Sequence, residues 1–387
     1  MSEKYEQLGV SATKEEVHRA ITQLPPSEIE GSFVRIAKHF NDPNAYMSLH
    51  TDTAGTKPIL AYLMWKETGN LNVWQSISVD ALVMNTDDLL CNGFSSKFAI
   101  VNNIARNKHR ISGSVLEALI EGTMNFINQM KEYGIEIRHL GGETADVGDL
   151  IRTIDVGFSV YSEASKEEVI PTQPREGNVI VGLASFGMTT YETSYNSGIG
   201  SNGITLARHT LLSKQYAEKY PETVDDTLLF SLVYQGHYYL GSKVSCDLTV
   251  ADVLLAPTRT YLPLMVHVLQ KFRKKIDAII HCTGGGQTKV FNFIKDKPLK
   301  VVKDSPFAPP IVFRLIQETG NISWKEMYQV FNMGWRLEIY TDGDTAQKII
   351  EMASEFDISA RIVGYVAPDK QPRVIIRSPD NKWLYYE

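Results

Sequence analysis

The chain has 387 residues, more than one hydrophobic core usually organises, so we expect two domains. Its 43% hydrophobic and 22% charged residues are typical of a soluble globular protein. A net charge of −6, with no lysine- or arginine-rich run, argues against a nucleic-acid partner.

The cysteines and the first residues indicate a cytoplasmic protein. Cys91, Cys246 and Cys282 lie far apart and form no CxxC pair, which fits a reducing compartment. The first ten residues are charged and lack the apolar core of a signal peptide. No apolar run approaches the roughly 20 residues that cross a bilayer. We therefore expect a cytoplasmic location and no membrane partner.

Hydrophobic patterns in the first half of the chain predict a mixture of strands and helices. Strands are expected at 46–50, 73–78, 97–104, 135–140 and 153–161. Helices are expected to begin at Pro58, whose missing N–H suits a first turn, after Ser78 as a capping residue, and at Ser114. The second of these helices ends near Gly93 and the third ends at Gly134.

A polar segment with two prolines and a glycine, 162–177, marks a boundary between domains of residues 1–172 and 173–387. In the second half, strands are expected at 178–184, 277–281, 335–341, 360–366 and 374–376. Helices are expected at 204–211, after Pro257, and at 345–356. Because strands and helices mix without strict βαβ alternation, we assign the α+β class.

The loop 51–57 is the first candidate for phosphate chemistry. Gly55, Thr56 and Lys57 lie between a strand and a helix start, where backbone N–H groups favour anions and a lysine adds positive charge. Asp52 in the same loop is a plausible Mg²⁺ ligand. The spacing is not that of a Walker A motif, and an ordinary strand-to-helix turn with a solvated lysine also explains the loop.

The helix after Ser78 carries three carboxylates. Asp80 and Asp87 lie within roughly 20° of one another around a helix, and Asp88 lies roughly 80° further round. Stacked carboxylates repel unless a cation or a base joins them. The alternative is a solvated acidic face.

Two glycine-rich stretches follow predicted strands. Gly141, Gly142 and Glu143 close one strand, where glycines allow a backbone to approach a ligand closely and a tight turn is the alternative. Thr283 and three glycines at 284–286 follow another strand, and the N–H groups of such a loop can hold a phosphate. A flexible surface turn is the alternative there. The preceding His281 is interpreted as a strand-end histidine.

These stretches, in this order, resemble the aminoimidazole ribonucleotide synthetase (phosphoribosylformylglycinamidine cyclo-ligase) family. The matching residues are Tyr5, Gly9 and Val10, followed by 51–57, 141–145, 201–203, 254–261, 283–286 and 326–334. They cover nearly the whole chain, and their order and spacing argue against chance similarity.

The resemblance implies a fold, a reaction and partners. It implies a cytoplasmic homodimer, in which each N-terminal domain gives a four-stranded sheet to a shared barrel and the C-terminal half is an α/β domain. It also implies ATP, with Mg²⁺, and a ribonucleotide substrate. ATP phosphorylates the formyl amide oxygen of formylglycinamidine ribonucleotide, and the amidine nitrogen then closes the imidazole ring as phosphate leaves.

The resemblance also implies roles for residues. The expected ATP-binding residues are Asp52, Gly55, Thr56, Lys57, Asp80, Asp88, Gly141, Gly142 and Glu143, with Asp52, Asp80 and Asp88 as metal ligands. The expected substrate-binding residues are Ser201, Asn202, Gly203, Thr283, Gly284, Gly285 and Gly286. No catalytic side chain is assigned.

Several positions depart from the family pattern. Thr53 and Ala54 replace glycines, and Val101 begins a stretch that lacks a family carboxylate, for which Asp87 could compensate. The segment before Ser201 is longer than in the family and is a candidate lid. These departures leave two alternatives open: another ATP-using enzyme on the same scaffold, or a catalytically silent nucleotide-binding protein.

Overall fold

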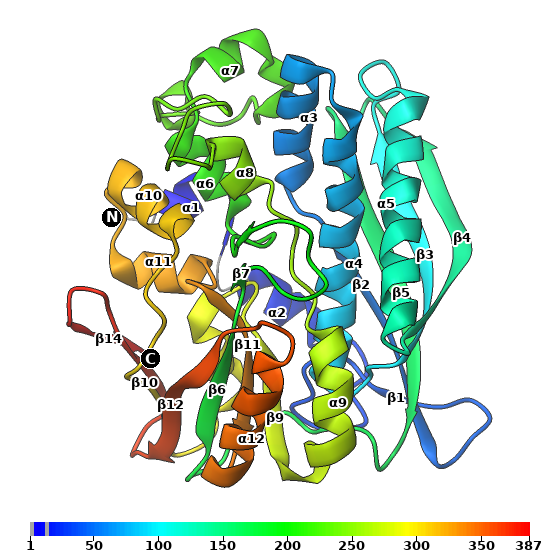
Figure 1. Ribbon diagram of the computed structural model, residues 1–387, viewed down its shortest axis with the longest axis vertical. Coiled ribbons are helices and arrows are strands. Elements are labelled where there is room, and N and C mark those ends of the chain that lie inside the picture. Colours follow the sequence, from blue (N-terminus) through cyan, green and yellow to red (C-terminus); the bar gives the residue numbers. More distant parts are fainter. Residues whose placement is uncertain (1–3, 12–14) are drawn as a thin grey trace.

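Two β-sheets, one from each half of the chain, organise the computed structural model, which describes residues 4–11 and 15–387 (Figure 1). The first sheet has five strands and the second has seven. Helices accompany both sheets, so the fold is α+β with two sheet domains, as expected. The expected boundary at residue 172 falls between the last strand of the first sheet and the first strand of the second.

The first sheet is mainly antiparallel, in the order β1-β2-β5-β3-β4, and only β3 and β4 pair in parallel. Its strands are β1 (Ala37–Lys38), β2 (Ala45–Thr53), β3 (Lys97–Arg106), β4 (Glu136–Asp146) and β5 (Ile154–Ser165). The helices of this half are α1 (Lys4–Gln7), α2 (Glu15–Ile21), α3 (Lys57–Thr68), α4 (Gln75–Leu90) and α5 (Gly113–Glu132), with the 3-10 turn η1 (Leu71–Trp74). Helix α4 packs on β2, β5 and α5, so one face of the sheet is covered.

The second sheet has the order β14-β13-β10-β12-β6-β11-β9. Its strands are β6 (Val179–Ala184), β9 (Ile276–His281), β10 (Leu299–Lys303), β11 (Trp335–Thr341), β12 (Ala360–Pro368), β13 (Arg373–Arg377) and β14 (Trp383–Tyr386), and a separate pair joins β7 (Phe186–Gly187) to β8 (Asn196–Ser197). The helices are α6 (Ile204–Leu211), α7 (Gln215–Lys219), α8 (Val250–Leu254), α9 (Leu262–Phe272), α10 (Ile311–Gly320), α11 (Trp324–Val330) and α12 (Gly343–Ser354), with 3-10 turns η2 (Pro221–Thr223), η3 (Phe230–Leu232), η4 (Arg273–Lys275) and η5 (Gly286–Phe293).

Helix α3 joins the two halves through their cores. Ala61 and Tyr62 belong to the buried cluster of the first sheet. Leu60 and Leu63, on other faces of the same helix, belong to the buried cluster of the second sheet. Burial on both sides fixes α3, and the loop 51–57 before it, at the contact between the two halves.

Two expectations about elements were wrong. The predicted strand 73–78 is instead the turn η1 followed by the start of α4, because its apolar residues Trp74 and Ile77 continue into the buried stripe of a helix. Gly141, Gly142 and Glu143 do not form a loop after a strand but lie within β4. Their pairing with β3 resumes at Asn102 after a register shift.

Residues 188–200, in the segment expected as a candidate lid, form a strap that contacts both halves of the chain. Tyr191 donates from its hydroxyl to the carbonyl oxygen of Thr260 at 2.7 Å, and its own carbonyl oxygen accepts from Gln129 of α5 at 2.6 Å. Glu192 pairs with the fully buried Arg259 at 2.6 Å. Bonds to both halves therefore hold the strap in place. Within the described part of the chain, no helix combines the length and apolarity needed to cross a membrane.

Candidate active site between the two domains

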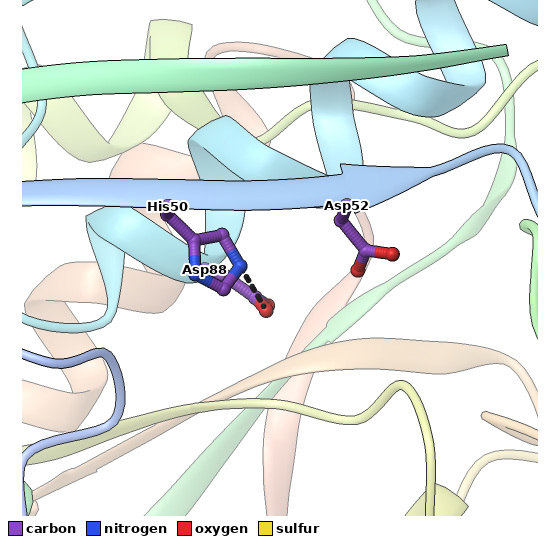
Figure 2. A group of neighbouring side chains, drawn as sticks. All are labelled: His50, Asp52 and Asp88. Carbon is purple, nitrogen blue, oxygen red and sulfur yellow. Dashed lines mark hydrogen bonds and ion pairs between the residues drawn. The ribbon is translucent and has the colours of Figure 1, made fainter. Parts of the chain in front are cut away.

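A group of three side chains marks the candidate site. His50 and Asp52 extend from the same face of β2 toward Asp88 of α4 (Figure 2). One ligand atom from each residue lies within 4.8 Å of the others. His50 Nε2 is 3.2 Å from Asp88 Oδ2, and Thr53 donates its backbone N–H to Asp52 Oδ1 at 2.7 Å. The sequence predicted Asp52 and Asp88 for this site, but it gave no signal for His50 other than its place two residues before Asp52.

The two carboxylates lie in opposite electrostatic environments. Burial and the nearby Asp88 charge raise the pKa of Asp52. Burial opposes the charge of Asp88 as well, but hydrogen bonds from His281 and His50 outweigh it and hold the Asp88 pKa well below its usual range. Asp88 is therefore ionised. The ionised form of Asp52 is unfavourable in the folded protein unless a cation binds beside it.

Residues of the second domain contact this group of three side chains. His281, the last residue of β9, lies 2.6 Å through Nδ1 from Asp88 Oδ1. The glycine loop follows directly, and Lys289 bonds Thr283 Oγ1 of that loop at 2.8 Å. The positive charge of Lys289 also acts on the pKa values of Asp52 and Asp88. The carboxylates of one half and the glycine loop of the other therefore form one site.

The glycine loop, residues 283–286, has a backbone conformation and a packing environment that require glycine. Gly285 and Gly286 have φ values of +90° and +51°, which other residues rarely adopt. A Cβ on Gly286 would lie 2.5 Å from the carbonyl oxygen of Tyr328, so the backbone must pack there without a side chain. A positive φ therefore accounts for both glycines, and close backbone packing accounts for Gly286 as well.

Lys57 and Asp80 do not belong to the group. Both side chains are fully buried, and Lys57 Nζ lies 2.8 Å from Asp80 Oδ1. Lys57 also donates to the carbonyl oxygen of Ala256, and Asp80 accepts from the backbone and the hydroxyl of Thr258. Burial lowers the Lys57 pKa, and Asp80 opposes this shift. The structure therefore keeps Lys57 and Asp80 apart from His50, Asp52 and Asp88, because the two side chains pair with each other through Asp80 Oδ1. Asp80 Oδ2 is buried and has no hydrogen-bond partner among the described residues.

Asp87 does not supply a replacement charge to the metal group either. Its side chain is fully buried and accepts from Thr260 Oγ1 at 3.1 Å and from Arg336 Nη2 at 3.3 Å. Burial raises its pKa to about 7, although Arg336 opposes this shift. The expected grouping of Asp80 with Asp87 on one helix face is confirmed, because Asp80 accepts from Thr258 and Asp87 from Thr260. The cations that join these carboxylates are Lys57 and Arg336.

The loop 51–57 meets the other expected substrate residues. A Cβ on Gly55 would lie 3.7 Å from the carbonyl oxygen of Ser201. Thr56 Oγ1 and Thr205 Oγ1 are 2.9 Å apart, and Ser201 Oγ is 2.8 Å from Thr258 Oγ1. Residues 201–203 lead into α6, with Gly203 as its N-cap at a φ of +73°. The structure therefore brings these two stretches together across the domain contact.

The structure does not bring Gly141, Gly142 and Glu143 to the carboxylate group of the same chain. Their strand β4 lies at the edge of the first sheet, separated from β2 by β5 and β3. All three residues are exposed. A Cβ on Gly142 would lie 2.3 Å from the carbonyl oxygen of Asn102, so close strand packing explains this glycine without a ligand.

The donor set at the group fits Mg²⁺ in part. Asp52 and Asp88 offer the carboxylate oxygens that Mg²⁺ prefers, and the raised Asp52 pKa shows that the site favours added positive charge. His50 and His281 both bond Asp88, and hydrogen-bond partners of this kind orient a carboxylate that binds a metal. Asp80 is not part of this group, since the ligand atoms that lie together are those of His50, Asp52 and Asp88.

Sequence reasoning missed Lys289 and Arg336 as parts of this region. Lys289 lies three residues after the glycine loop and belongs to none of the stretches that match the family. Arg336 lies in β11, which was predicted correctly, but nothing in a buried strand pattern marks an arginine that reaches the site.

Sequence comparisons connect both halves to one family. The sequence model of the AIR synthase related protein N-terminal domain matches residues 33–163, and that of the C-terminal domain matches residues 175–377. A phosphoribosylformylglycinamidine cyclo-ligase of Methanococcus vannielii is 30% identical over 344 residues, 89% of this chain and 83% of that protein. One of Thermococcus kodakarensis is 31% identical over 294 residues, 75% of this chain and 70% of that protein.

Solved structures share the fold at low identity. The structure titled T. maritima PurL complexed with FGAR has a TM-score of 0.56 at 12% identity, covering 97% of this chain and 49% of that chain. The structure titled AaThiL complexed with AMPPCP and TMP has a TM-score of 0.54 at 12% identity, covering 95% and 94%. The matches to both domain models and the 30% identity to the Methanococcus vannielii protein show that the chain belongs to the AIR synthase related protein family.

Proposed function

We propose that this protein is an ATP-dependent cyclo-ligase that converts formylglycinamidine ribonucleotide to aminoimidazole ribonucleotide in purine synthesis. Relatives that cover most of the chain carry the name phosphoribosylformylglycinamidine cyclo-ligase. The observation that carries the proposal is the contact between the acidic helix α4 of the first half and the end of β9 in the second half. Asp88 bonds His281, which lies two residues before Thr283 of the glycine loop.

The reaction replaces a poor leaving group by a good one. The formyl amide oxygen takes the γ-phosphoryl group of ATP, the amidine nitrogen attacks the same carbon, and phosphate leaves as the ring closes. The protein must hold nitrogen and carbon in line and compensate the charge on the phosphates. Bound Mg²⁺ would neutralise phosphate oxygens. Asp52 and Asp88 would hold it, with His50 and His281 orienting Asp88.

The same arrangement of the two domains assigns roles to further residues. Lys289 takes the role of phosphate cation that was expected of Lys57, because Lys57 Nζ is committed to Asp80 and Ala256. Lys289 is partly exposed and adjoins Thr283. Backbone N–H groups of the glycine loop, together with Ser201 and Asn202, would bind the ribonucleotide phosphate and ribose.

The proposal includes a cytoplasmic homodimer. The face of the first sheet away from α4 carries exposed apolar side chains on three strands, namely Leu49, Val101 and Leu140. Such a patch on a soluble protein marks an interaction surface. Pairing two copies through it would build the shared barrel. It would also give the exposed Gly141, Gly142 and Glu143 a place beside a partner chain, where ATP would bind.

A turnover assay tests the proposal. Purified protein is supplied with ATP, Mg²⁺ and formylglycinamidine ribonucleotide, and both ADP and aminoimidazole ribonucleotide are measured. We expect the two products in equal amounts. Folded protein that makes ADP without the imidazole, or that makes neither, would contradict the cyclo-ligase activity.

A further inference from the structure

Four side chains form a buried ring beside the candidate site. The ring consists of Asp87, Asp88, His281 and Arg336. Asp87 and Asp88 are consecutive on α4, whereas His281 and Arg336 lie on the neighbouring strands β9 and β11. Arg336 Nε is 2.8 Å from His281 Nε2, His281 Nδ1 is 2.6 Å from Asp88 Oδ1, and Arg336 Nη2 is 3.3 Å from Asp87 Oδ2. The ring therefore joins the two domains at the metal-ligand candidate Asp88.

The direction of the hydrogen bonds in the ring follows from chemistry. An arginine side chain has only donors, so His281 Nε2 must accept from Arg336 and carries no proton. The one proton of the neutral imidazole then lies on Nδ1, where it is donated to Asp88. With the other tautomer, a lone pair of Nδ1 would face the Asp88 carboxylate. The donor Arg336 at Nε2 and the anionic Asp88 at Nδ1 therefore favour the same tautomer, and Arg336 is the residue that keeps Nε2 free of a proton.

Arg336 is itself held in one orientation. Its side chain is 1% exposed, and its guanidinium lies 5.2 Å from the ring centre of Tyr261. Nη2 donates to Asp87 and to the carbonyl oxygen of Arg259. Nη1 has no hydrogen-bond partner among the described residues, so the bonds that fix the side chain are those of Nε and Nη2.

We propose that Arg336 is a positioning residue of the cyclo-ligase site: it fixes His281 as the Nδ1-protonated tautomer and so holds Asp88 in place to bind the metal of the metal–ATP complex. Asp87 supports this role by anchoring Nη2. The inference rests on the proposed function for its choice of ligand. It assigns a task to two buried charges, Asp87 and Arg336, that do not touch the metal group themselves.

The experiment compares variants of Arg336 and Asp87 with a control variant in another buried ion pair of β11. Glu338 of the same strand is also fully buried and pairs with the buried Lys303 at 2.6 Å. Arg336→Met and Arg336→Lys test the donor, Asp87→Asn tests its anchor, and Glu338→Gln is the control for loss of a buried ion pair. Each protein is measured by ¹⁵N NMR for the tautomer of His281 and by electron paramagnetic resonance for Mn²⁺ binding with a non-hydrolysable ATP analogue.

We expect wild-type His281 to be protonated at Nδ1 alone. Arg336→Met should populate the Nε2-protonated form and weaken Mn²⁺ binding about 10- to 100-fold, the usual effect of losing a residue that orients a metal ligand. Arg336→Lys, which keeps a donor, should recover part of the binding, and Asp87→Asn should lie between. Glu338→Gln should lower thermal stability but leave the tautomer and the Mn²⁺ affinity unchanged.

An unchanged tautomer with Mn²⁺ affinity within twofold of wild type in Arg336→Met would overturn the inference. So would an equal loss of affinity in Glu338→Gln, which would show general destabilisation. If Arg336→Met does not fold, Arg336→Lys and Asp87→Asn decide by the same criteria. Wild-type turnover, measured in parallel, separates the two claims. Protein that binds Mn²⁺ and the analogue but makes no imidazole contradicts the proposed function and leaves the role of Arg336 standing.

Discussion

Asp52 carries a charge that the folded protein compensates poorly. Burial and the neighbouring Asp88 raise its pKa, which means that the folded state disfavours the ionised form. A carboxylate with a raised pKa costs stability at pH values above that pKa, and the cost disappears when acid protonates it. A cation bound beside Asp52 would offset this cost in stability.

Asp52→Asn should therefore separate stability from function. Without metal at pH 8, we expect the variant to be more stable than wild type, because asparagine removes a buried charge that lies beside Asp88. The gain should vanish near pH 4, while the Mg²⁺ dependence of ATP binding is weakened or lost. Asn can keep the bond from the Thr53 N–H. Urea denaturation at both pH values and calorimetry with Mg²⁺ and ATP measure this, and a variant less stable than wild type at pH 8 would refute the charge argument.

His209 provides a pH-dependent contribution away from the site. It is 3% exposed, stacks on Tyr234, and accepts the Tyr234 backbone N–H at Nδ1. Burial, assisted by the Arg208 charge, lowers its pKa to about 3 from 6.5. A depressed histidine pKa means that the folded state binds the proton less well than the unfolded state. Its stabilisation is complete above pH 6.5 and is lost as the pH falls toward 3.

His209→Asn should flatten that dependence. The amide oxygen can replace Nδ1 as acceptor but does not titrate. Between pH 6.5 and 4.5, we expect wild type to lose up to about 1.4 kcal/mol more stability per pH unit than the variant. Denaturant titrations of both proteins across this range give the difference directly. Parallel curves would show that His209 does not stay neutral in the folded state.

Among the elements, α3 and α4 are joined to the second domain by the Lys57–Asp80 pair. Both side chains are fully buried, and their further bonds go to Ala256 and Thr258. Removing one partner leaves the other charge buried and unpaired, which typically costs about 3–5 kcal/mol. Replacing both by apolar residues avoids that penalty.

We expect Lys57→Met and Asp80→Leu to be strongly destabilising as single changes and the double variant to be more stable than either. Urea denaturation supplies the three free energies of unfolding. The exposed pair of Lys219 and Glu67 gives the comparison, and Glu67→Gln should change stability little. Additive losses in the double variant would contradict a coupled buried pair.

The elements also show how far sequence reasoning reaches. Strand 335–341 was predicted with its true bounds because Gly334 precedes a β-branched and aromatic run and Asp342 caps the next helix. Strand 73–78 was wrong because a short apolar run does not distinguish a strand from the start of a buried helix. Ordered motifs identified Asp52 and the glycine loop, and the spacing of carboxylates on the predicted helix drew attention to Asp88. They could not assign partners to Asp80, Asp87 and Asp88, since α4 is buried on nearly all sides and those partners come from distant segments.

At the scale of the whole molecule, the outer face of the first sheet should join two copies of the chain. Light scattering after gel filtration should give wild type twice the 43.5 kDa chain mass. Leu140→Asp places a charge on the apolar patch, at the edge strand β4, and should give the monomer mass. Phe230→Asp is the control, because Phe230 is exposed on η3, outside this sheet. A monomeric wild type, or a dimer unaffected by Leu140→Asp, would exclude this interface.

The most direct test of the proposed reaction follows one oxygen atom. Formylglycinamidine ribonucleotide labelled with ¹⁸O in the formyl group is turned over with ATP in ordinary water, and the inorganic phosphate is examined by mass spectrometry. Phosphorylation of the formyl oxygen predicts one ¹⁸O atom in each phosphate released. Unlabelled phosphate, with the ¹⁸O in water, would show that ring closure does not pass through the phosphorylated amide.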